Sequence, residues 1–358
     1  MIRKSQLFYL RSSLKFVLLF ILGCSSPDDK GIKSFVVTKE AESEFKLSEI
    51  AKSVEYISLE TNDSSYLSLI QEIKFYKDRL YVVDFPGRIL VFDMSGKFIQ
   101  QIGSEGEGPG EFYNLSSFVI DKDSETLYLA SGRRLITYTL DNEYIAEKSF
   151  PFFIDYLEII DKNLNLIAAN DGVKAGDKFV NQRSLYKVNS ELAIVDSIPL
   201  LRVEMNEAIG AIYPYKNYIS NIEGENYIYT PVLYNESIIR DTLFRIEERV
   251  LKPALKLDFA PPLFNEDGNK LILIKNMMLS KNFLICEYNR EGSSKLYIGA
   301  RNTDLSVNLK EGLLIEDEEI VTLRPFDLSN DQFYFVKTYN YSDISTEELN
   351  PMIGIVKL

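Results

Sequence analysis

The chain has 358 residues, of which 46% are hydrophobic and 12% aromatic, and this is enough apolar surface for a large folded core. Its formal net charge of −13 lacks the basic surface that a phosphate-backbone binder needs, so we expect no nucleic-acid partner. The chain contains no histidine, which excludes Ser-His-Asp and Cys-His catalysis and any histidine-ligated zinc site.

The first 23 residues have the anatomy of a signal peptide. Basic residues precede the apolar stretch 16–22, which is far shorter than the about 20 residues of a membrane span. The stretch ends in ILGC at Cys24, which resembles the lipobox of bacterial lipoproteins and implies lipidation of Cys24. An ordinary secretory signal with an incidental cysteine is the alternative.

Residues 24–45 are predicted to be a lipidated tether, although Phe35 to Val37 could add a strand. The acidic pair Asp28 and Asp29 resembles the surface-export tag of Bacteroidetes lipoproteins. We therefore expect an outer-membrane lipoprotein and leave open whether it faces the periplasm or the cell surface. The membrane is then a partner through the lipid anchor.

The rest of the chain, residues 46–358, repeats one pattern of a short apolar strand, a tight polar turn and a second apolar strand. Its six copies begin at Ile73, Phe118, Leu157, Tyr218, Met277 and Phe326. A third strand follows each hairpin, and the first five copies continue into a fourth. Four antiparallel strands repeated about an axis are typical of a β-propeller blade.

The sixth copy ends at Leu358 without a fourth strand, whereas an unpaired alternating strand, Val54–Leu59, precedes the first copy. Pairing this strand with the last blade would close the ring and remove an open sheet edge. We therefore predict an all-β fold, a six-bladed β-propeller of four-stranded antiparallel blades closed by an N-terminal strand. A β-sandwich would not repeat this strand order.

Residues 80–103 resemble an NHL repeat, and GSEGEGPGEF at residues 103–112 is similar to the signature of six-bladed β-propeller lipoproteins of Bacteroidetes. Members of that family are largely of unknown function, so the resemblance implies a fold and a cellular location rather than an activity. The glycines allow positive φ where the chain descends to the next blade, and Phe112 is expected to wedge between blades.

Blade topology places nearly all long segments on one face, and binding usually resides on long loops over a rigid scaffold. The candidate ligand-face residues are Arg88, Arg133, Arg134, Asp171, Arg183, Tyr213, Tyr215, Tyr234, Asn235, Arg290 and Tyr341. Tyrosines mixed with amides and charges suit sugars or peptides. The alternative is that such polar loops are merely tolerated, and in NHL-like repeats arginines such as Arg88, Arg133 and Arg134 brace neighbouring blades.

We interpret the chain as a membrane-anchored extracytoplasmic binding module that recognises a glycan, a peptide or an outer-membrane partner protein on the long-loop face. The alternative is a histidine-independent propeller enzyme, a lyase or hydrolase using carboxylate, tyrosine and arginine. No catalytic residues stand out, so the sequence favours binding over catalysis. We predict no cofactor and no metal ligands, and leave a cation in the channel open because no calcium-loop spacing occurs.

Overall fold

A computed structural model of the protein describes residues 32–85, 87–210, 213, 215–234, 236–316, 319–338 and 348–358. The predicted signal peptide and Cys24 lie outside the described residues. The folded unit runs from Lys33 to Leu358. It is all-β apart from two short 3₁₀ helices in the described ranges, η1 (Leu47–Glu49) and η2 (Leu328–Asn330). No helix in those ranges has the length and apolarity of a membrane span.

The strands form four-stranded antiparallel sheets, as the repeat pattern predicts. In four sheets the strands pair in chain order. The first two of these are β3 (Ile70–Tyr76), β4 (Arg79–Asp84), β5 (Arg88–Asp93) and β6 (Phe98–Ile102), then β7 (Leu115–Asp121), β8 (Thr126–Ser131), β9 (Arg134–Thr139) and β10 (Tyr144–Ser149). The other two are β11 (Phe153–Ile160), β12 (Asn163–Ala175), β13 (Lys178–Val188) and β14 (Ile194–Met205), then β19 (Ile272–Leu279), β20 (Phe283–Arg290), β21 (Ser293–Ala300) and β22 (Ser306–Lys310).

Two further sheets recruit strands from the N-terminal region. One contains β15 (Ile219–Ile222), β16 (Glu225–Ile228), β17 (Thr242–Glu247) and β18 (Val250–Phe259), and β1 (Lys33–Val37) joins it in parallel to β18. The other has the order β2 (Ser53–Ser58), β27 (Met352–Lys357), β26 (Gln332–Lys337) and β25 (Arg324–Asp327). A two-stranded pair, β23 (Leu313–Leu314) and β24 (Ile320–Val321), lies between them in sequence.

Tight turns set the register of the hairpins. Positive φ at both central residues, as at Lys77 with Asp78 and Asp161 with Lys162, is the geometry whose twist matches the flanking strands. The middle strands β4 and β5 are buried on both faces and are nearly all apolar, which is why their hydrophobic runs do not alternate.

The N-terminal strand β2 pairs with β27 along its whole length, from Ser53 opposite Lys357 to Ser58 opposite Met352. Tyr56 and Phe335 lie opposite Gly354 on the two neighbouring strands, and their rings meet edge to face 5.9 Å apart. A Cβ at residue 354 would come within 2.1 Å of the Phe335 ring, so glycine is required for this packing. The predicted pairing of the N-terminal strand with the last repeat is therefore present.

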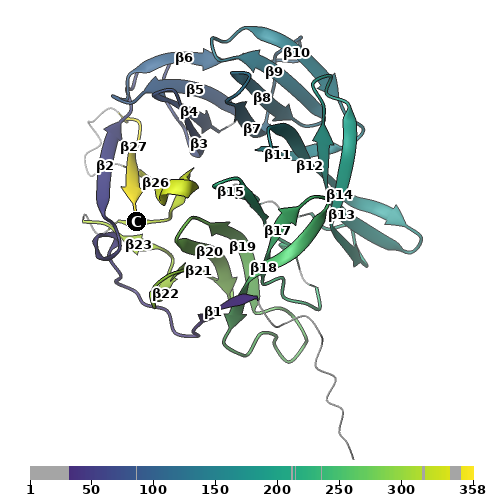
Figure 1. Ribbon diagram of the computed structural model, residues 1–358, viewed down its shortest axis with the longest axis vertical. Helices are drawn as coiled ribbons and strands as arrows, with labels where there is room; N and C mark the ends of the chain where they lie inside the picture. Colours follow the sequence, from purple (N-terminus) through teal and green to yellow (C-terminus); the bar gives the residue numbers. More distant parts are fainter. Residues whose placement is uncertain are drawn as a thin grey trace, which may run out of the picture. The chain divides into compact units, whose positions relative to one another are not determined.

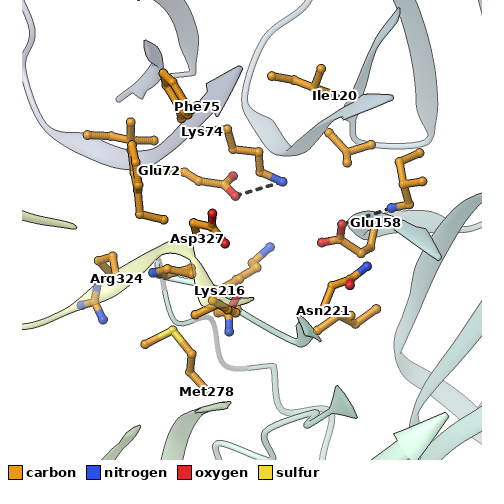
Figure 2. Close-up of a pocket in the computed structure, with 18 of the residues that line it drawn as sticks. Glu72, Lys74, Phe75, Ile120, Glu158, Lys216, Asn221, Met278, Arg324 and Asp327 are labelled. Atoms are coloured by element: carbon orange, nitrogen blue, oxygen red, sulfur yellow. Dashed lines mark hydrogen bonds and ion pairs between the residues drawn. The ribbon is translucent and has the colours of Figure 1, made fainter. Parts of the chain in front are cut away.

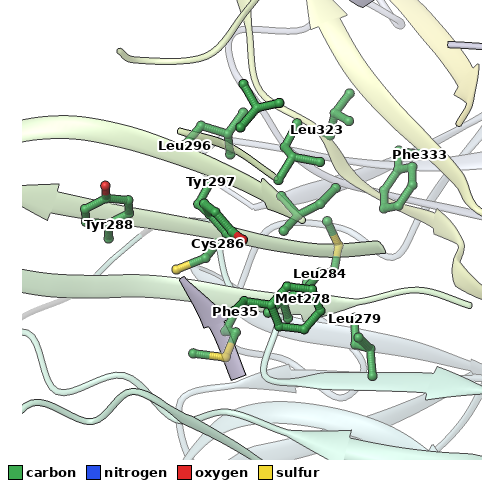
Figure 3. Packing of buried hydrophobic residues seen from close by; sticks show 14 of the residues in the cluster. Phe35, Met278, Leu279, Leu284, Cys286, Tyr288, Leu296, Tyr297, Leu323 and Phe333 are labelled. Atoms are coloured by element: carbon green, nitrogen blue, oxygen red, sulfur yellow. The ribbon is translucent and has the colours of Figure 1, made fainter. Parts of the chain in front are cut away.

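The strand that the sequence allowed at Phe35 to Val37, within the predicted tether, is present. Lys33–Val37 is a strand of the folded unit, because Phe35 and Val37 are buried against β18 and its neighbours. Phe35 packs edge to face on Tyr297 at 6.5 Å, in space that Gly299 leaves free. Figure 3 shows Phe35 beside the fully buried Cys286, which is the inert core thiol that its apolar strand predicts.

The glycine-rich segment 103–112 connects the first sheet to the second. Gly103 and Gly110 have φ of +65° and +80°, the left-handed region expected of them. Phe112 is 4% exposed and lies in a core cluster with Val91 of β5 and Phe118 of β7. The prediction that this segment turns between sheets and inserts a phenylalanine between them is confirmed.

The long segments expected to be loops are in part strands. Residues 169–183 continue β12 and β13 into an extended hairpin, and β20 and β21 extend to a tight turn at Glu291 and Gly292. Hydrophobic periodicity does not predict this extension, because an exposed hairpin is rich in polar residues and needs no continuous apolar face. In Figure 1 the first strands β3, β7, β11 and β15 lie nearer the middle of the folded unit than β6, β10 and β14.

Candidate functional site

A cavity of about 780 Å³ lies where the first strands of the six repeats converge, and we call it the central channel. Each strand contributes to its wall: Glu72 and Lys74 on β3, Val119 and Ile120 on β7, Tyr156 and Glu158 on β11, Ile219 and Asn221 on β15, Asn276 and Met278 on β19, and Arg324 and Phe326 on β25. Small-molecule sites usually enclose about 300–1,000 Å³. A second cavity of about 300 Å³ shares Gln71, Glu72, Tyr156 and Lys216 with the channel.

Bulges recur near the start of the first strands, and each leaves a polar residue out of the ladder. In four first strands the register shifts at the same place, between Ile70 and Glu72, Leu115 and Ser117, Ile154 and Tyr156, and Ile274 and Asn276. The residues skipped are Gln71, Ser116, Asp155 and Lys275. A bulge re-aims a side chain and is common beside binding sites.

Two glutamates enter the channel from different sheets. Figure 2 shows Glu72, Lys74, Glu158 and Lys216 around the same cavity. The Glu72 carboxylate lies 3.3 Å from the Lys74 ammonium. Glu158 instead accepts hydrogen bonds from the Ile159 amide at 3.1 Å and the Tyr156 hydroxyl at 3.5 Å. Burial raises the pKa of both glutamates above the ordinary value, and Lys74 opposes that rise.

An ionic cluster surrounds the buried Asp155, behind the channel residue Lys216. Its carboxylate accepts from the Lys216 ammonium at 2.7 Å and the Tyr218 hydroxyl at 3.2 Å, and the Arg183 guanidinium lies 3.5 Å away. Arg183 also forms an ion pair with Asp171. Lys216 is therefore held at the point where the two cavities meet.

A second ionic cluster surrounds Glu287. Its carboxylate pairs with Arg324 and accepts from the Tyr213 hydroxyl at 2.7 Å and the Asn276 amide at 3.1 Å. The Arg324 guanidinium also lies over the Tyr215 ring, 4.4 Å from its centroid. Burial by itself would raise the pKa of Glu287, but Arg324 and these donors hold the pKa below its usual range.

Amide side chains line the wall between these clusters. Asn217, Asn226 and Asn276 are buried, while Asn221 is exposed to the channel. Asn217 Nδ2 and Asn226 Oδ1 are buried without a hydrogen-bond partner among the described residues. Such groups cost about 1–3 kcal/mol each when left unpaired. Two of these amides therefore have hydrogen-bonding capacity left over.

Four of the predicted ligand-face residues come together in these clusters. Tyr213 and Tyr215 belong to the Glu287 cluster, and Asp171 and Arg183 to the Asp155 cluster. Tyr234 packs on a small apolar cluster that includes Val232, and it interacts electrostatically with Arg183 and Asp171. Asn235 and Tyr341 lie outside the described residues.

The remaining predicted arginines bind the protein's own backbone or lie at its surface. Arg88 pairs with the buried Asp84 and donates to the Tyr66 carbonyl at 2.7 Å. Arg134 pairs with Glu147 and donates to the Glu111 and Gly108 carbonyls. Arg290 is 4% exposed and donates to the carbonyls of residues 260 and 262. Arg133 is exposed beside the start of β9.

The channel residues themselves were not predicted from the sequence, among them Glu72, Lys74, Glu158 and Arg324. Their signal was a charged side chain interrupting the apolar first strand of a repeat, as Glu158 does within Leu157–Ile160. Convergence on one cavity requires the arrangement of all six sheets, which no single strand reveals. Within the described ranges no group of three or more histidine, cysteine, aspartate or glutamate side chains could hold a metal ion.

The comparisons with known proteins agree with the fold. A family model described as a domain of unknown function, DUF4934, matches residues 33–356. A Bacteroides fragilis protein assigned as exported is similar in structure, with a TM-score of 0.63 at 19% identity, over 91% of this chain and 99% of that one. No curated protein sequence matches the chain.

Two other solved structures are more distant. The extracellular domain of a one-component system from Bacteroides thetaiotaomicron has a TM-score of 0.40 at 15% identity, over 80% of this chain and 33% of that one. A PQQ-bound aldose sugar dehydrogenase from Streptomyces coelicolor has a TM-score of 0.43 at 11% identity, over 85% of this chain and 98% of that one.

Proposed function

This chain belongs to the DUF4934 family of domains of unknown function, and we propose that it is an exported binding module that holds a small polar ligand in its central channel. The observation that carries the proposal is the set of polar and charged side chains that line one cavity to which the first strand of every repeat contributes. A rigid scaffold with a few convergent polar groups is the usual form of a ligand site.

The proposal includes a closed six-bladed β-propeller as the scaffold. Six four-stranded antiparallel units and the pairing of β2 with β27 support it, because this pairing joins the first and last parts of the chain in one sheet. The similarity to the exported Bacteroides fragilis protein supports the same fold over almost the whole length of both chains.

The proposal places the module outside the cytoplasm, anchored to the outer membrane by lipid on Cys24. The lipobox-like ILGC motif supports the anchor, and the description of the Bacteroides fragilis protein as exported supports the compartment. The long-loop face predicted to bind is then one end of the channel, where Tyr213 and Tyr215 contact its wall through Glu287 and Arg324.

Thermal unfolding with added ligands, with the channel open or blocked by a large side chain, tests this function. The full-length chain in detergent is melted by circular dichroism with panels of glycans, peptides and divalent cations. A ligand at 100 times its dissociation constant stabilises the fold by about 2.7 kcal/mol. We expect Asn221→Trp, which places a large ring in the cavity, to abolish the shift. Glu191→Trp, on an exposed outer turn, should retain it.

Stabilisation that persists in Asn221→Trp would place the ligand elsewhere and contradict the proposal. The melting temperature of each variant without ligand serves as the control for folding. Binding to an external surface would instead be weakened by substitutions outside the channel.

A histidine-independent enzyme is the second candidate, and one observation favours it. Two channel glutamates with raised pKa stand in different settings, Glu72 paired with Lys74 and Glu158 bonded only to neutral donors among the hydrogen bonds and ion pairs described. Acid–base catalysis uses such differences between two carboxyl groups. The test is whether the protein converts a bound compound into a released product. An enzyme would do so, whereas a binding module would return the compound unchanged.

A further inference from the structure

Several charged side chains at the central channel form ion pairs. Glu72 pairs with Lys74, Asp155 with Lys216, and Glu287 with Arg324. Glu158 is shifted towards its neutral form by burial. A ligand with a formal charge would need an opposite charge that these pairs do not leave over, so the part of the channel beside them suits a neutral molecule.

Hydrogen-bonding capacity is nevertheless left over among the residues that line the channel. Asn217 Nδ2 is an unpaired donor and Asn226 Oδ1 an unpaired acceptor, on residues that are 8% and 4% exposed. Both residues line the channel, and amide rotation exchanges the donor and acceptor positions. Glu158 on β11 retains acceptor capacity, because a carboxyl group offers several lone-pair sites.

An apolar platform lies on other strands that line the same cavity. Phe75 of β3 and Phe326 of β25 stack with their ring centroids 5.3 Å apart at an interplanar angle of 23°, and both line the channel. Flat apolar rings beside amides and carboxyl groups match a molecule that has a C–H face and a rim of hydroxyls.

We infer that the central channel binds a neutral saccharide, whose hydroxyls satisfy Asn217, Asn226 and Glu158 while a sugar ring packs on Phe75 and Phe326. A hydroxyl both donates and accepts, so one group type satisfies the amide donor, the amide acceptor and the carboxyl group. A short peptide brings charged termini for which the paired ions leave no partner. This inference rests on the proposed function and names the ligand class of the same site.

The chain contains no tryptophan, so one introduced tryptophan is a unique fluorescent reporter. We would place it by Phe75→Trp in the full-length chain in detergent, and titrate xylotriose, cellotriose and maltotriose against triglycine. The control reporter is Ile145→Trp, on the outer strand β10 where Ile145 is 50% exposed. We expect a saturable change with at least one trisaccharide in the channel reporter only.

Asn217→Ala and Asn226→Ala in the reporter chain should each weaken that binding about tenfold or more, since a lost buried hydrogen bond costs about 1–3 kcal/mol. Asn206→Ala, on an exposed turn outside the channel, should leave the affinity unchanged. If either buried variant fails to fold, Asn221→Ala replaces it, because Asn221 is exposed in the channel.

Saturation by triglycine and not by the trisaccharides would overturn the saccharide inference and leave the channel as a binding site. The absence of any trisaccharide response at millimolar concentration would also overturn the inference. The proposed function fails separately, when ligands found in the thermal panels still bind the Asn221→Trp chain.

Discussion

At the residue scale, the informative side chains are charged ones that are largely buried. Arg324 and Glu287 are 13% and 8% exposed at their side chains, and Tyr213, Tyr215 and Asn276 pack around them. A buried ion pair contributes little net stability, but removing one partner leaves an uncompensated buried charge. The pair therefore positions the tyrosines at the channel end more than it stabilises the fold.

The single variant Arg324→Met should lower the free energy of unfolding by about 3–5 kcal/mol, because it leaves Glu287 buried without its cation. The double variant Arg324→Met/Glu287→Gln should recover most of that loss. Urea unfolding followed by far-UV circular dichroism at neutral pH measures both. Equal losses in the single and double variants would contradict this account.

The same pair predicts a pH dependence with a definite sign. The pKa of Glu287 is lower in the folded state than in the unfolded state, so its contribution to stability is complete above about pH 4.3. It is lost as the pH falls through the folded-state pKa. The double variant, which has no carboxyl group at 287, should lack this part of the acid slope.

At the element scale, the N-terminal strands are integral to sheets formed far along the chain. β1 extends the β15–β18 sheet and β2 completes the sheet of β25–β27. Ile57 of β2 is 7% exposed and lies in one core cluster with Ile73, Tyr334 and Ile353. This cluster joins the first repeat to the last through a strand that belongs to neither.

Ile57→Ala should therefore destabilise the protein by about 2–4 kcal/mol, as expected for a truncated core isoleucine. Glu55→Ala, at an exposed position of the same strand, should change stability by no more than about 0.5 kcal/mol. Chemical unfolding of both variants under identical conditions makes the comparison. A loss below about 1 kcal/mol for Ile57→Ala would mean that β2 is not a structural part of the last sheet.

At the scale of the whole molecule, the proposed lipid anchor and the proposed binding channel belong to separate parts of the chain. The folded unit begins at Lys33, so few residues separate Cys24 from the first strand. A short connection would hold the module close to the membrane to which it is attached. With a net charge of −13, the anchored protein would also be repelled by anionic headgroups.

We expect the full-length chain, expressed in a bacterium with lipoprotein processing, to incorporate labelled palmitate and to sediment with membranes. Cys24→Ala should lose both properties, since several acyl chains on one thiol supply the membrane affinity. Ser25→Ala is the matched control and should behave as the parent chain. Membrane association of Cys24→Ala without lipid would contradict the anchor.

The sequence by itself determined the all-β class, the repeat of four antiparallel strands and the attachment of an N-terminal strand to the last repeat. These depend on local signals: apolar runs such as Leu80–Val83, positive-φ turns such as Lys77 with Asp78, and the glycines of 103–112. The sequence also indicated that Phe112 and Cys286 are buried, because each lies beside apolar neighbours.

Only the tertiary structure decided where the polar chemistry lies. Glu72, Glu158, Asn217 and Arg324 are far apart in sequence and share no motif, and they meet because the first strands of six sheets line one cavity. The structure likewise shows that Arg88, Arg134 and Arg290 donate hydrogen bonds to backbone carbonyls of the protein. A sequence pattern does not reveal where those carbonyls lie. Strand periodicity is a short-range property, whereas a binding cavity depends on contacts between distant segments.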